Sequence, residues 1–302
     1  MHRTFDVIIV GAGPAGLSAA LILGRCRRTV LVCDTGKPRN ASSHALHGYL
    51  TRDGISPAEF LAIGRQELAI YDTVEMRPVG AAAAECQTDA RFKVTLEDGE
   101  AVVSRKLLLA TGVVDNLPKI AGLKELYGRS VFHCPYCDGW ELRDEPVAVY
   151  GRGHRGLGLA LELTVWTRDL VLCTDGPSEI DDEGRGRLER NSIAVREDRI
   201  AALEGRDGIL ERVVFENGQV LTRRALFFTT GQWQRSQLAI DLGCDLNEKG
   251  TVPTGRYEKT HLPGLFVAGD ASHAVQWVVV AAAEGAEAAF AINNDLVKED
   301  LK

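Results

Sequence analysis

Residues 133–140 read HCPYCDGW and hold the two closely spaced cysteines of the chain. Cys134 and Cys137 can close a small reversible disulfide, and a helix that begins beneath them would stabilise the thiolate that attacks a partner disulfide. Asp138 follows directly, so a carboxylate can relay protons to a leaving thiol. These residue types at this spacing predict redox chemistry.

Two other interpretations of the pair are weaker. A zinc site needs four ligands, and although His133 adjoins the pair, the chain has no second C-x-x-C or H-x-x-x-H. We therefore predict no metal. A purely structural disulfide is rare in the cytosol. The remaining cysteines occur singly, and we expect them to be buried small hydrophobic residues: Cys26, Cys33, Cys86, Cys173 and Cys244.

Composition limits the classes of partner. With 302 residues, 45% of them hydrophobic, the chain is long enough for two domains. The net charge is −7 and no basic run exceeds residues 25–28. The positive surface that nucleic acid or an acidic membrane requires is therefore missing, and neither is expected as a partner.

The N-terminal stretch from Phe5 to Gly24 is largely apolar and could be mistaken for a signal peptide or a membrane span. Asp6 interrupts the apolar run, no A-x-A-like cleavage site follows, and the glycines form a motif of their own. The scattered cysteines also suit a reducing compartment. We expect a soluble cytoplasmic protein.

That motif begins the elements that must position the chemistry. Residues 5–34 read FDVIIVGAGPAGLSAALILGRCRRTVLVCD, a strand, a glycine turn, an amphipathic helix and a second strand. Gly11 permits the tight turn, Gly13 lets the backbone approach a pyrophosphate, and Gly16 allows close helix packing. Asp34, at the end of the second strand, can accept hydrogen bonds from a ribose. The unit predicts a dinucleotide site.

A second unit of the same kind spans residues 147–175 and reads VAVYGRGHRGLGLALELTVWTRDLVLCTD. Its glycines are Gly151, Gly153 and Gly156, and its terminal acid is Asp175. Two such units predict two dinucleotide-binding domains, the second for NAD(P). The alternative is a duplicated fold whose second copy has kept its backbone and lost its ligand.

Two further motifs carry a family resemblance. An ATG segment ends at Gly112, and LPGLFVAGDAS at residues 262–272 is followed by an alanine-rich helix from about residue 276. With the two fingerprints, in this order, the chain resembles the two-domain flavoprotein disulfide reductases. The resemblance implies an FAD site formed by Gly11, Gly13, Gly16, Asp34, Thr111, Gly112, Gly269, Asp270 and Gln276.

The position of the cysteines selects a branch of that superfamily. No cysteine pair follows Asp34, and CPYCD lies just before the second fingerprint. This is similar to the low-molecular-weight thioredoxin reductases. The resemblance implies that Cys137 is the thiol nearest the flavin and that Cys134 attacks the substrate. It also implies a homodimer, a rotating inserted domain and a thioredoxin-like partner or a small-molecule disulfide.

The second fingerprint departs from the NADPH pattern of that family. The third small residue is Gly156 rather than alanine, and the next strand ends in CTDGPSEIDDEG without the basic run that holds a 2′-phosphate. Asp175 would repel that phosphate and suits the free ribose of NADH. Arg152 and Arg155 in the turn leave NADPH open.

Three alternatives to a nucleotide-driven reductase follow from these departures. HCPYCDGWE also resembles dithiol oxidases that form disulfides in small molecules. Other relatives of this fold take electrons from ferredoxin or another flavin instead of a pyridine nucleotide. A flavin-binding redox sensor without turnover belongs to a different class of protein.

The sequence therefore predicts an α/β protein with two Rossmann-like domains. An FAD domain comprises residues 1–115 and 246–302, and an inserted NAD(P)-type domain with the C-x-x-C comprises residues 116–245. The expected activity is FAD-dependent disulfide oxidoreduction, in which electrons pass between a reductant, FAD, the cysteine pair and an external disulfide or dithiol.

Overall fold

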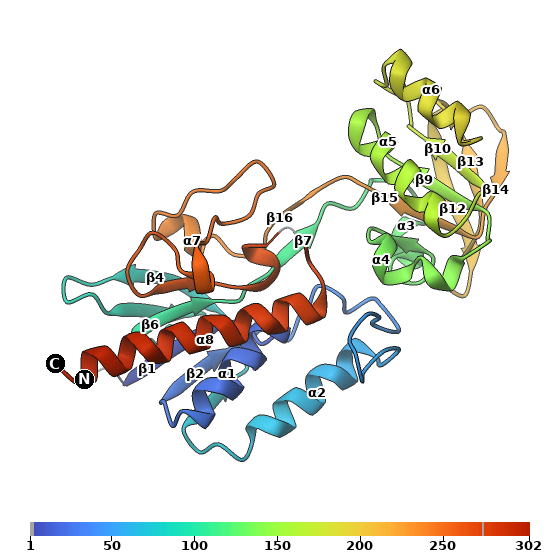
Figure 1. Ribbon diagram of the computed structural model, residues 1–302. Helices are drawn as coiled ribbons and strands as arrows, with labels where there is room; N and C mark the ends of the chain where they lie inside the picture. Colours follow the sequence, from blue (N-terminus) through green and yellow to red (C-terminus); the bar gives the residue numbers. More distant parts are fainter. Residues whose placement is uncertain (1–2, 274) are drawn as a thin grey trace. The chain divides into compact units, whose positions relative to one another are not determined.

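The computed structural model describes residues 3–273 and 275–302, which cluster into two compact units (Figure 1). Unit 1 consists of Met1–Ala41, Gly48–Asp115 and Gln232–Lys302, and unit 2 consists of Ser42–His47 and Asn116–Gly231. Each unit has its own hydrophobic cores and is described by itself.

A seven-stranded sheet forms the centre of unit 1, in the order β3-β2-β1-β6-β5-β4, with β17 paired to β6. The strands β3, β2, β1, β6 and β17 are parallel, whereas β5 and β4 are antiparallel. The strand bounds are β1 Thr4–Val10, β2 Val30–Cys33, β3 Val74–Arg77, β4 Ala81–Cys86, β5 Phe92–Leu96, β6 Ala101–Leu109 and β17 Leu265–Val267. A separate antiparallel pair joins β7 Val113–Asp115 to β16 Gln232–Gln234.

Strand β1 explains the apolar run of the first fingerprint. Val7 and Ile9 belong to the core on one face of the sheet, and Ile8 and Val10 belong to the core on the other. A parallel strand covered on both faces has no solvent side, so its sequence is continuously apolar instead of alternating.

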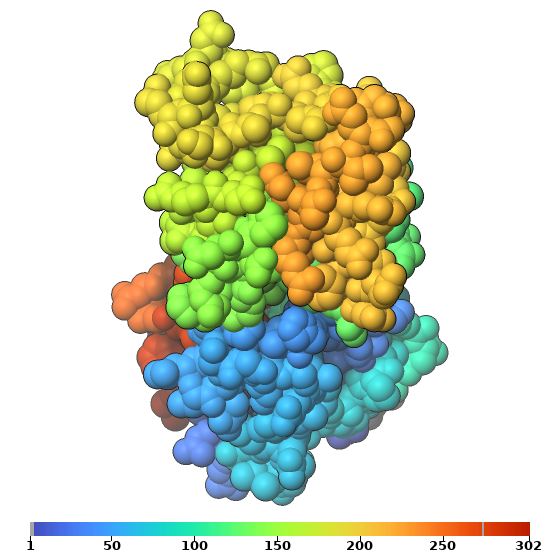
Figure 2. Space-filling view, turned by 90° about the vertical axis from the view of Figure 1, so that its right-hand side faces the viewer, coloured from blue at the N-terminus to red at the C-terminus, as the bar shows by residue number. Residues whose placement is uncertain are grey.

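Helices α1 Pro14–Arg25 and α8 Val278–Asp300 pack together against the sheet (Figure 1). Gly285 permits their close approach, because a Cβ built there would lie 2.0 Å from the main-chain oxygen of Ala15. Helix α2 Pro57–Leu68 is more exposed and contributes to the light-blue surface of Figure 2. The short helices of this unit are α7 Leu238–Asp241, η3 Arg256–Glu258 and η4 Gly269–Ala271.

Unit 2 is built on a five-stranded parallel sheet in the order β11-β10-β9-β15-β8. Its strands are β8 Val131–Phe132, β9 Val147–Tyr150, β10 Leu170–Cys173, β11 Ala194–Arg196 and β15 Ala225–Phe228, and a three-stranded antiparallel sheet contains β12 Ile200–Arg206, β13 Ile209–Phe215 and β14 Val220–Thr222. The helices are α3 Leu123–Leu126, α4 Pro135–Asp138, η1 Trp140–Leu142, α5 Gly153–Glu162, η2 Leu163–Val165 and α6 Asp182–Arg190.

Both glycine turns thus join a parallel strand to a helix, and the predicted fold class of two Rossmann-like domains is confirmed. The compact units differ in detail from the expected boundaries. The chain returns to unit 1 at Gln232 rather than near residue 246, because β16 pairs with β7. Residues 42–47 cluster with unit 2. The assignment of the functional domains stays a prediction. Within the described ranges, no helix is long and apolar enough to cross a membrane.

Candidate active site

The first glycine turn connects β1 to α1 and is shaped by contacts that exclude side chains. Gly11 has φ +104°, and a Cβ built on it would lie 2.3 Å from the main-chain oxygen of Ala110. A Cβ built on Gly16 would lie 1.9 Å from the oxygen of Gly11. Gly13 has an ordinary φ of −73°, and no described atom lies within 4 Å of its built Cβ. Gly11 and Gly16 are required for folding, whereas the space beside Gly13 is open.

The charges around this turn suit an anion. Helix α1 carries no acidic residue, so its N-terminal N–H groups and the helix dipole present positive potential. Asp34 braces the turn, because its Oδ1 accepts from the N–H of Ala12 at 3.1 Å and its Oδ2 accepts from the N–H of Gly36 at 3.2 Å. Arg65 also approaches Oδ2, at 3.3 Å. The open cradle and its donors fit the pyrophosphate of a dinucleotide.

The ATG segment lies beside this turn. The N–H of Ala110 donates to the oxygen of Val10 at 2.8 Å, which continues the β1–β6 pairing to the edge of the turn. Thr111 follows, and Gly112 has φ +66° with its oxygen accepting from the N–H of Arg235 at 3.1 Å. Thr111 and Gly112 are therefore close in the fold to Gly11.

The late Gly-Asp motif forms η4 after β17. Gly269 has φ +78°, and its N–H donates to Glu284 Oε2 at 2.7 Å. Glu284 is buried, and no hydrogen bond reaches its Oε1 from the described residues. Burial raises the pKa of Glu284 to about 7, with smaller contributions from neighbouring carboxylates. The sequence analysis missed Glu284, although an acid inside the run AAAEGAEAA was a visible signal.

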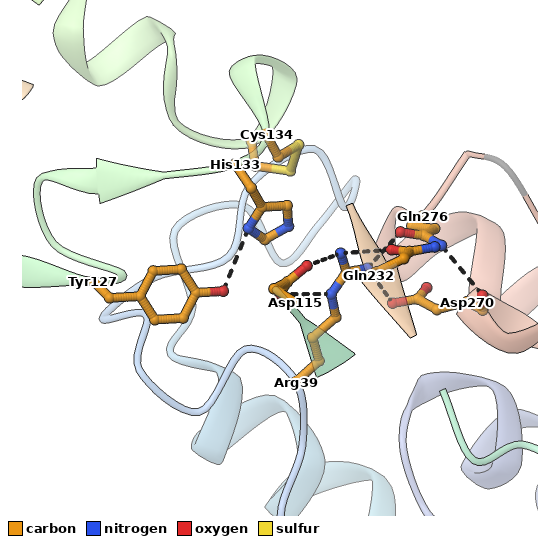
Figure 3. Close-up of a disulfide and its surroundings, with 9 residues drawn as sticks. Arg39, Asp115, Tyr127, His133, Cys134, Gln232, Asp270 and Gln276 are labelled. Atoms are coloured by element: carbon orange, nitrogen blue, oxygen red, sulfur yellow. Dashed lines mark hydrogen bonds and ion pairs between the residues drawn. A yellow bond between two sulfur atoms is a disulfide. The ribbon is translucent and has the colours of Figure 1, made fainter. Parts of the chain in front are cut away.

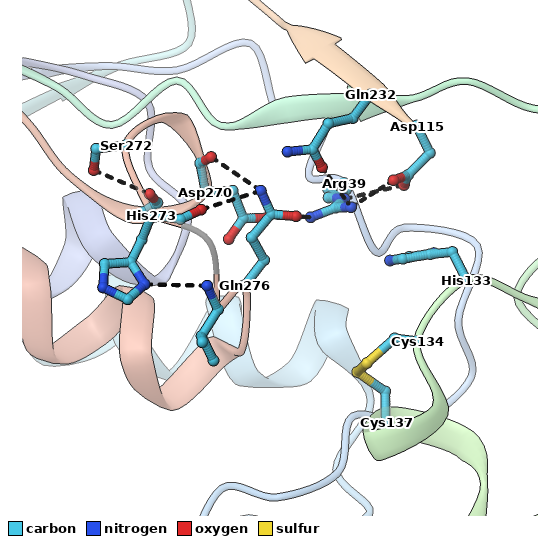
Figure 4. A network of polar contacts seen from close by, with 12 residues as sticks. Arg39, Asp115, His133, Cys134, Cys137, Gln232, Asp270, Ser272, His273 and Gln276 are labelled. Atoms are coloured by element: carbon cyan, nitrogen blue, oxygen red, sulfur yellow. Dashed lines mark hydrogen bonds and ion pairs between the residues drawn. A yellow bond between two sulfur atoms is a disulfide. The ribbon is translucent and has the colours of Figure 1, made fainter. Parts of the chain in front are cut away.

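Arg39 is the centre of a polar network in unit 1 that the sequence analysis also missed (Figure 4). Its guanidinium pairs with Asp115 through two nitrogens, and its Nη1 donates to Asp270 Oδ2 at 2.8 Å and to Gln276 Oε1 at 2.6 Å. Gln232 accepts a further bond at 3.2 Å. Although burial alone lowers the pKa of Arg39, the hydrogen bond and charge of Asp115 raise it above its ordinary value.

The guanidinium of Arg39 thus lies between the carboxylates of Asp115 and Asp270. Asp270 and Gln276 are predicted to contact the flavin, and Arg39 fixes both side chains. Asp115 lies 76 residues from Arg39 in the chain, and Asp270 lies 231 residues from it. No local pattern can reveal such a contact.

In unit 2, Cys134 and Cys137 form a disulfide with a Cα–Cα distance of 5.3 Å (Figure 3). Cys134 is the N-cap of α4, and its main-chain oxygen accepts from the N–H of Cys137 at 3.2 Å and of Asp138 at 3.3 Å. Pro135 at the first helical position presets the turn. The local sequence therefore places both sulfurs on one short turn.

Asp138 has the electrostatics of a proton carrier at neutral pH. Burial, and secondarily the carboxylate of Glu141, raises the pKa of Asp138 from 3.8 to about 7. Glu141 in turn lies 3.6 Å from His47. On the other side of the pair, the hydroxyl of Tyr127 contacts Nδ1 of His133 at 3.4 Å (Figure 3).

The second glycine turn repeats the close glycine–glycine contact of the first but not its backbone torsions, since Gly11 has a positive φ and Gly151 does not, and Gly13 has φ −73°. A Cβ built on Gly156 would lie 2.5 Å from the carbonyl carbon of Gly151, and one built on Gly151 would lie 2.9 Å from the Cα of Gly156. Gly153 has φ +54° and begins α5. The close helix packing that the fingerprint predicts is therefore present in unit 2.

Asp175 does not occupy the position that the sequence analysis gave it. Its Oδ1 accepts from the N–H of Ile200 at 2.8 Å, so the carboxylate joins β10 to β12. Thr174, not Asp175, stands 18 residues after Gly156, as Asp34 stands 18 residues after Gly16. The count from the third glycine thus already shows the one-residue difference, and the strand registers agree with it.

The single cysteines do not all follow the expectation of burial. Cys33, Cys173 and Cys244 are buried, whereas Cys26 and Cys86 are exposed. Burial raises the pKa of the Cys33 and Cys173 thiols to about 12, so both are unreactive near neutral pH. In the ranges that the structure describes, no cluster of three or more His, Cys, Asp or Glu side chains could hold a metal ion.

The strands, the two glycine turns and the helix-start disulfide together define a flavoprotein disulfide oxidoreductase. Residues 5–285 match the family model described as pyridine nucleotide-disulphide oxidoreductase, and the chain belongs to this family. Within it, the relatives identify a thioredoxin reductase-family enzyme. Family membership implies a flavin cofactor.

Three relatives illustrate the similarity. The chain is 32% identical to thioredoxin reductase sirT of Leptosphaeria maculans, over 98% of this chain and 96% of that protein. The crystal structure of HlmI is 37% identical with a TM-score of 0.93, covering 99% of this chain and 94% of that one. An oxidoreductase from Agrobacterium tumefaciens is 32% identical with a TM-score of 0.91, covering 98% and 99% of the two chains.

Proposed function

We propose that this enzyme is an FAD-dependent thiol–disulfide oxidoreductase whose Cys134/Cys137 pair exchanges electrons with an external disulfide or dithiol. The observation that carries the proposal is the closed disulfide at the start of α4 with Asp138, whose pKa is about 7, directly after it. A disulfide beside an acid that titrates at neutral pH is suited to reversible exchange.

Unit 1 supports the FAD part of the proposal. The open space beside Gly13, the acid-free start of α1 and the braced Asp34 fit the pyrophosphate end of the dinucleotide. Asp270 and Gln276, held by Arg39, would serve the flavin end. Bound FAD supplies a two-electron acceptor or donor for the cysteine pair.

The exchange itself balances on the residues of the chain. A thiolate of an external dithiol bonds to Sγ of Cys134 and breaks the Cys134–Cys137 bond, and Asp138 protonates the expelled sulfur of Cys137. The second external sulfur then bonds to the first and breaks the bond to Cys134, and its thiol proton passes to Cys134, so that the external pair becomes a disulfide and both cysteines become thiols. Reduction of an external disulfide is the reverse sequence. The family resemblance assigns Cys134 to the substrate and Cys137 to the flavin.

The partner in this proposal is a thioredoxin-like protein or a small-molecule disulfide or dithiol. Relatives named thioredoxin reductase favour the former. A homodimer remains part of the proposal on family grounds. A purified protein whose flavin can be reduced but never passes electrons to a disulfide would favour the sensor alternative instead.

Cysteine variants test the assignment. Anaerobic dithiothreitol should reduce the flavin of the wild-type holoenzyme, and Cys134→Ser and Cys137→Ser should each abolish this reduction. The matched control is Cys86→Ser, because Cys86 is exposed and lies outside the pair. Flavin reduction that survives in either pair variant would refute the mechanism.

The spectra of the same variants test the order of the thiols. Cys134→Ser should develop a long-wavelength absorbance band with bound FAD at alkaline pH, because the remaining thiolate is the one assigned to the flavin. Cys137→Ser should lack that band and instead form a stable mixed disulfide with a substrate thiol, detected by mass spectrometry. Identical spectra would contradict the assigned order.

A further inference from the structure

We propose that the second glycine turn binds no pyridine nucleotide, because the chain itself fills the positions at which a dinucleotide would make its contacts. The family of this enzyme implies a pyridine nucleotide, so the inference is a disagreement between this chain and its family. It concerns the electron donor, and it rests on the proposed function only in taking the protein to be a flavin-dependent redox enzyme.

The strand registers show which residues of the two turns are equivalent. Val10 pairs with Cys33 across β1 and β2, and Tyr150 pairs with Cys173 across β9 and β10. The glycine after each first strand then donates to the last residue of each second strand: Gly11 to Cys33 at 2.7 Å, and Gly151 to Cys173 at 3.3 Å. The next residues, Asp34 and Thr174, are therefore equivalent.

This equivalence removes the ribose-binding acid from unit 2. The Asp34 carboxylate accepts from the N–H of Ala12 and so faces its own glycine turn. Thr174 is buried, and its hydroxyl donates to the main-chain oxygen of Gly176 at 2.6 Å. Asp175, one residue later, is turned toward β12 by its bond to Ile200. Asp175 Oδ2 lies 3.9 Å from Nη2 of Arg152, so its carboxylate meets the second turn only in an ion pair with the turn's own arginine, and no carboxylate takes the place of Asp34.

The start of α5 is also in use. The N–H of Gly153, the second glycine of the fingerprint, donates to the main-chain oxygen of Ser178 at 2.8 Å. A Cβ built on Gly153 would lie 3.6 Å from the oxygen of Glu179, whereas the equivalent position at Gly13 is open to 4 Å. Two carbonyl groups of the loop after β10 therefore stand where a pyrophosphate would approach the helix.

Arg152 covers the end of β10. Its Nε donates to the main-chain oxygen of Thr174 at 2.6 Å, and its Nη2 donates to the main-chain oxygen of Asp175. A Cβ built on Gly176 would lie 2.9 Å from that Nη2. The guanidinium is thus used to hold the chain's own carbonyl groups, and it is not presented to a 2′-phosphate.

Contacts with Glu197 and Arg185 hold the loop after β10 in place. Glu197 Oε1 accepts from the N–H of Ser178 at 3.1 Å and from Arg185 at 2.9 Å, and Arg185 also donates to the hydroxyl of Ser178 at 2.7 Å. The N–H of Gly176 donates to the main-chain oxygen of Glu197 at 3.0 Å. Arg185 belongs to α6, which packs beside α5 (Figure 1). A nucleotide would have to displace this whole set of contacts.

A donor experiment on the intact holoenzyme tests the inference. NADH or NADPH at up to about 1 mM should neither reduce the flavin anaerobically nor give saturable heat in calorimetry, whereas dithiothreitol should reduce the flavin. Saturable binding of either nucleotide at a Kd below about 0.1 mM would overturn the inference, whether or not the flavin is reduced. Failure of dithiothreitol would instead count against the proposed function, and the calorimetric result would still decide the inference.

A matched pair of variants tests the part assigned to Arg152. Arg152→Ala should speed amide hydrogen exchange at Gly153 and Gly176 by about 10-fold or more, since charge-assisted bonds to two carbonyl groups are lost. Arg155→Ala, in the same turn, should leave that exchange unchanged and serves as the control. Equal exchange in the two variants would show that Arg152 does not hold the loop.

Discussion

Replacing Asp138 by asparagine should remove a titration near pH 7 from the exchange reaction. At pH 7 a carboxyl with the ordinary pKa of 3.8 is protonated in roughly one molecule in 1,600, whereas a pKa of about 7 leaves roughly half protonated. Burial of Asp138 therefore raises the supply of acid at neutral pH by roughly 800-fold. Asparagine keeps the shape and supplies no proton.

The assay mixes oxidised holoenzyme without oxygen with an aliphatic dithiol, at a fixed concentration of its thiolate form, and follows flavin reduction. In this direction Asp138 must donate a proton to Cys137, so the wild-type rate of flavin reduction should fall as pH rises, with a midpoint near 7. Asp138→Asn should be slower by about 100-fold or more below pH 7, without that midpoint. Glu141→Gln is the matched control: it removes a secondary cause of the raised pKa, so the midpoint should move to lower pH while the rate stays high.

The pH dependence of unfolding tests the raised pKa of Asp138 independently of the reaction rate. A folded-state pKa above the unfolded value means that the folded protein binds the proton more strongly, so this contribution to stability is present below about pH 4 and is lost as pH rises to about 7. The shift from 3.8 to about 7 corresponds to at most about 4 kcal/mol. Asp138→Asn should therefore gain stability over the wild type between pH 4 and pH 8 in urea unfolding. A wild-type rate midpoint that persists in Asp138→Asn would refute the reasoning.

Three further predictions concern unit 1. Gly13→Val should keep the circular dichroism of the wild type and weaken FAD binding by about 10- to 100-fold, as measured by flavin content. Gly16→Val should fail to fold, as measured by thermal melting. Full flavin retention in Gly13→Val would exclude the proposed pyrophosphate site beside Gly13. Arg39→Met should lower the free energy of unfolding in urea by about 3–5 kcal/mol, because it leaves the buried carboxylate of Asp115 without its cation. Adding Asp115→Asn should restore much of that free energy. No recovery in the double variant would contradict a buried ion pair between Arg39 and Asp115. Glu284→Gln should be more stable than the wild type at pH 8 but not at pH 4. The reason is that the pKa of Glu284 is raised to about 7, so the stability contributed by its protonated form is lost as pH rises to about 7. Equal unfolding midpoints of the variant and the wild type at both pH values would show that the pKa of Glu284 is not raised.

Much of the fold could be predicted from the chain because its signals are local. The strand–glycine–helix pattern of residues 5–34 requires Gly16 for a steric reason that acts within a few residues, since a Cβ there would meet the oxygen of Gly11. Gly11 itself is confined by Ala110, which follows a strand distant in the chain. The C-x-x-C spacing likewise brings two sulfurs onto one turn, and the disulfide is present. The fold class followed from repeating these local units.

The tertiary structure decided what depends on distant partners. Asp175 has the right residue type one residue beyond the position equivalent to Asp34, and only the structure shows that its carboxylate accepts from the N–H of Ile200 in β12. Arg39 acquires its role from partners 76 to 237 residues away, and Asp138 acquires a pKa of about 7 from burial. Local sequence determines which backbone shapes are possible, whereas the electrostatic environment of a side chain depends on everything the fold packs around it.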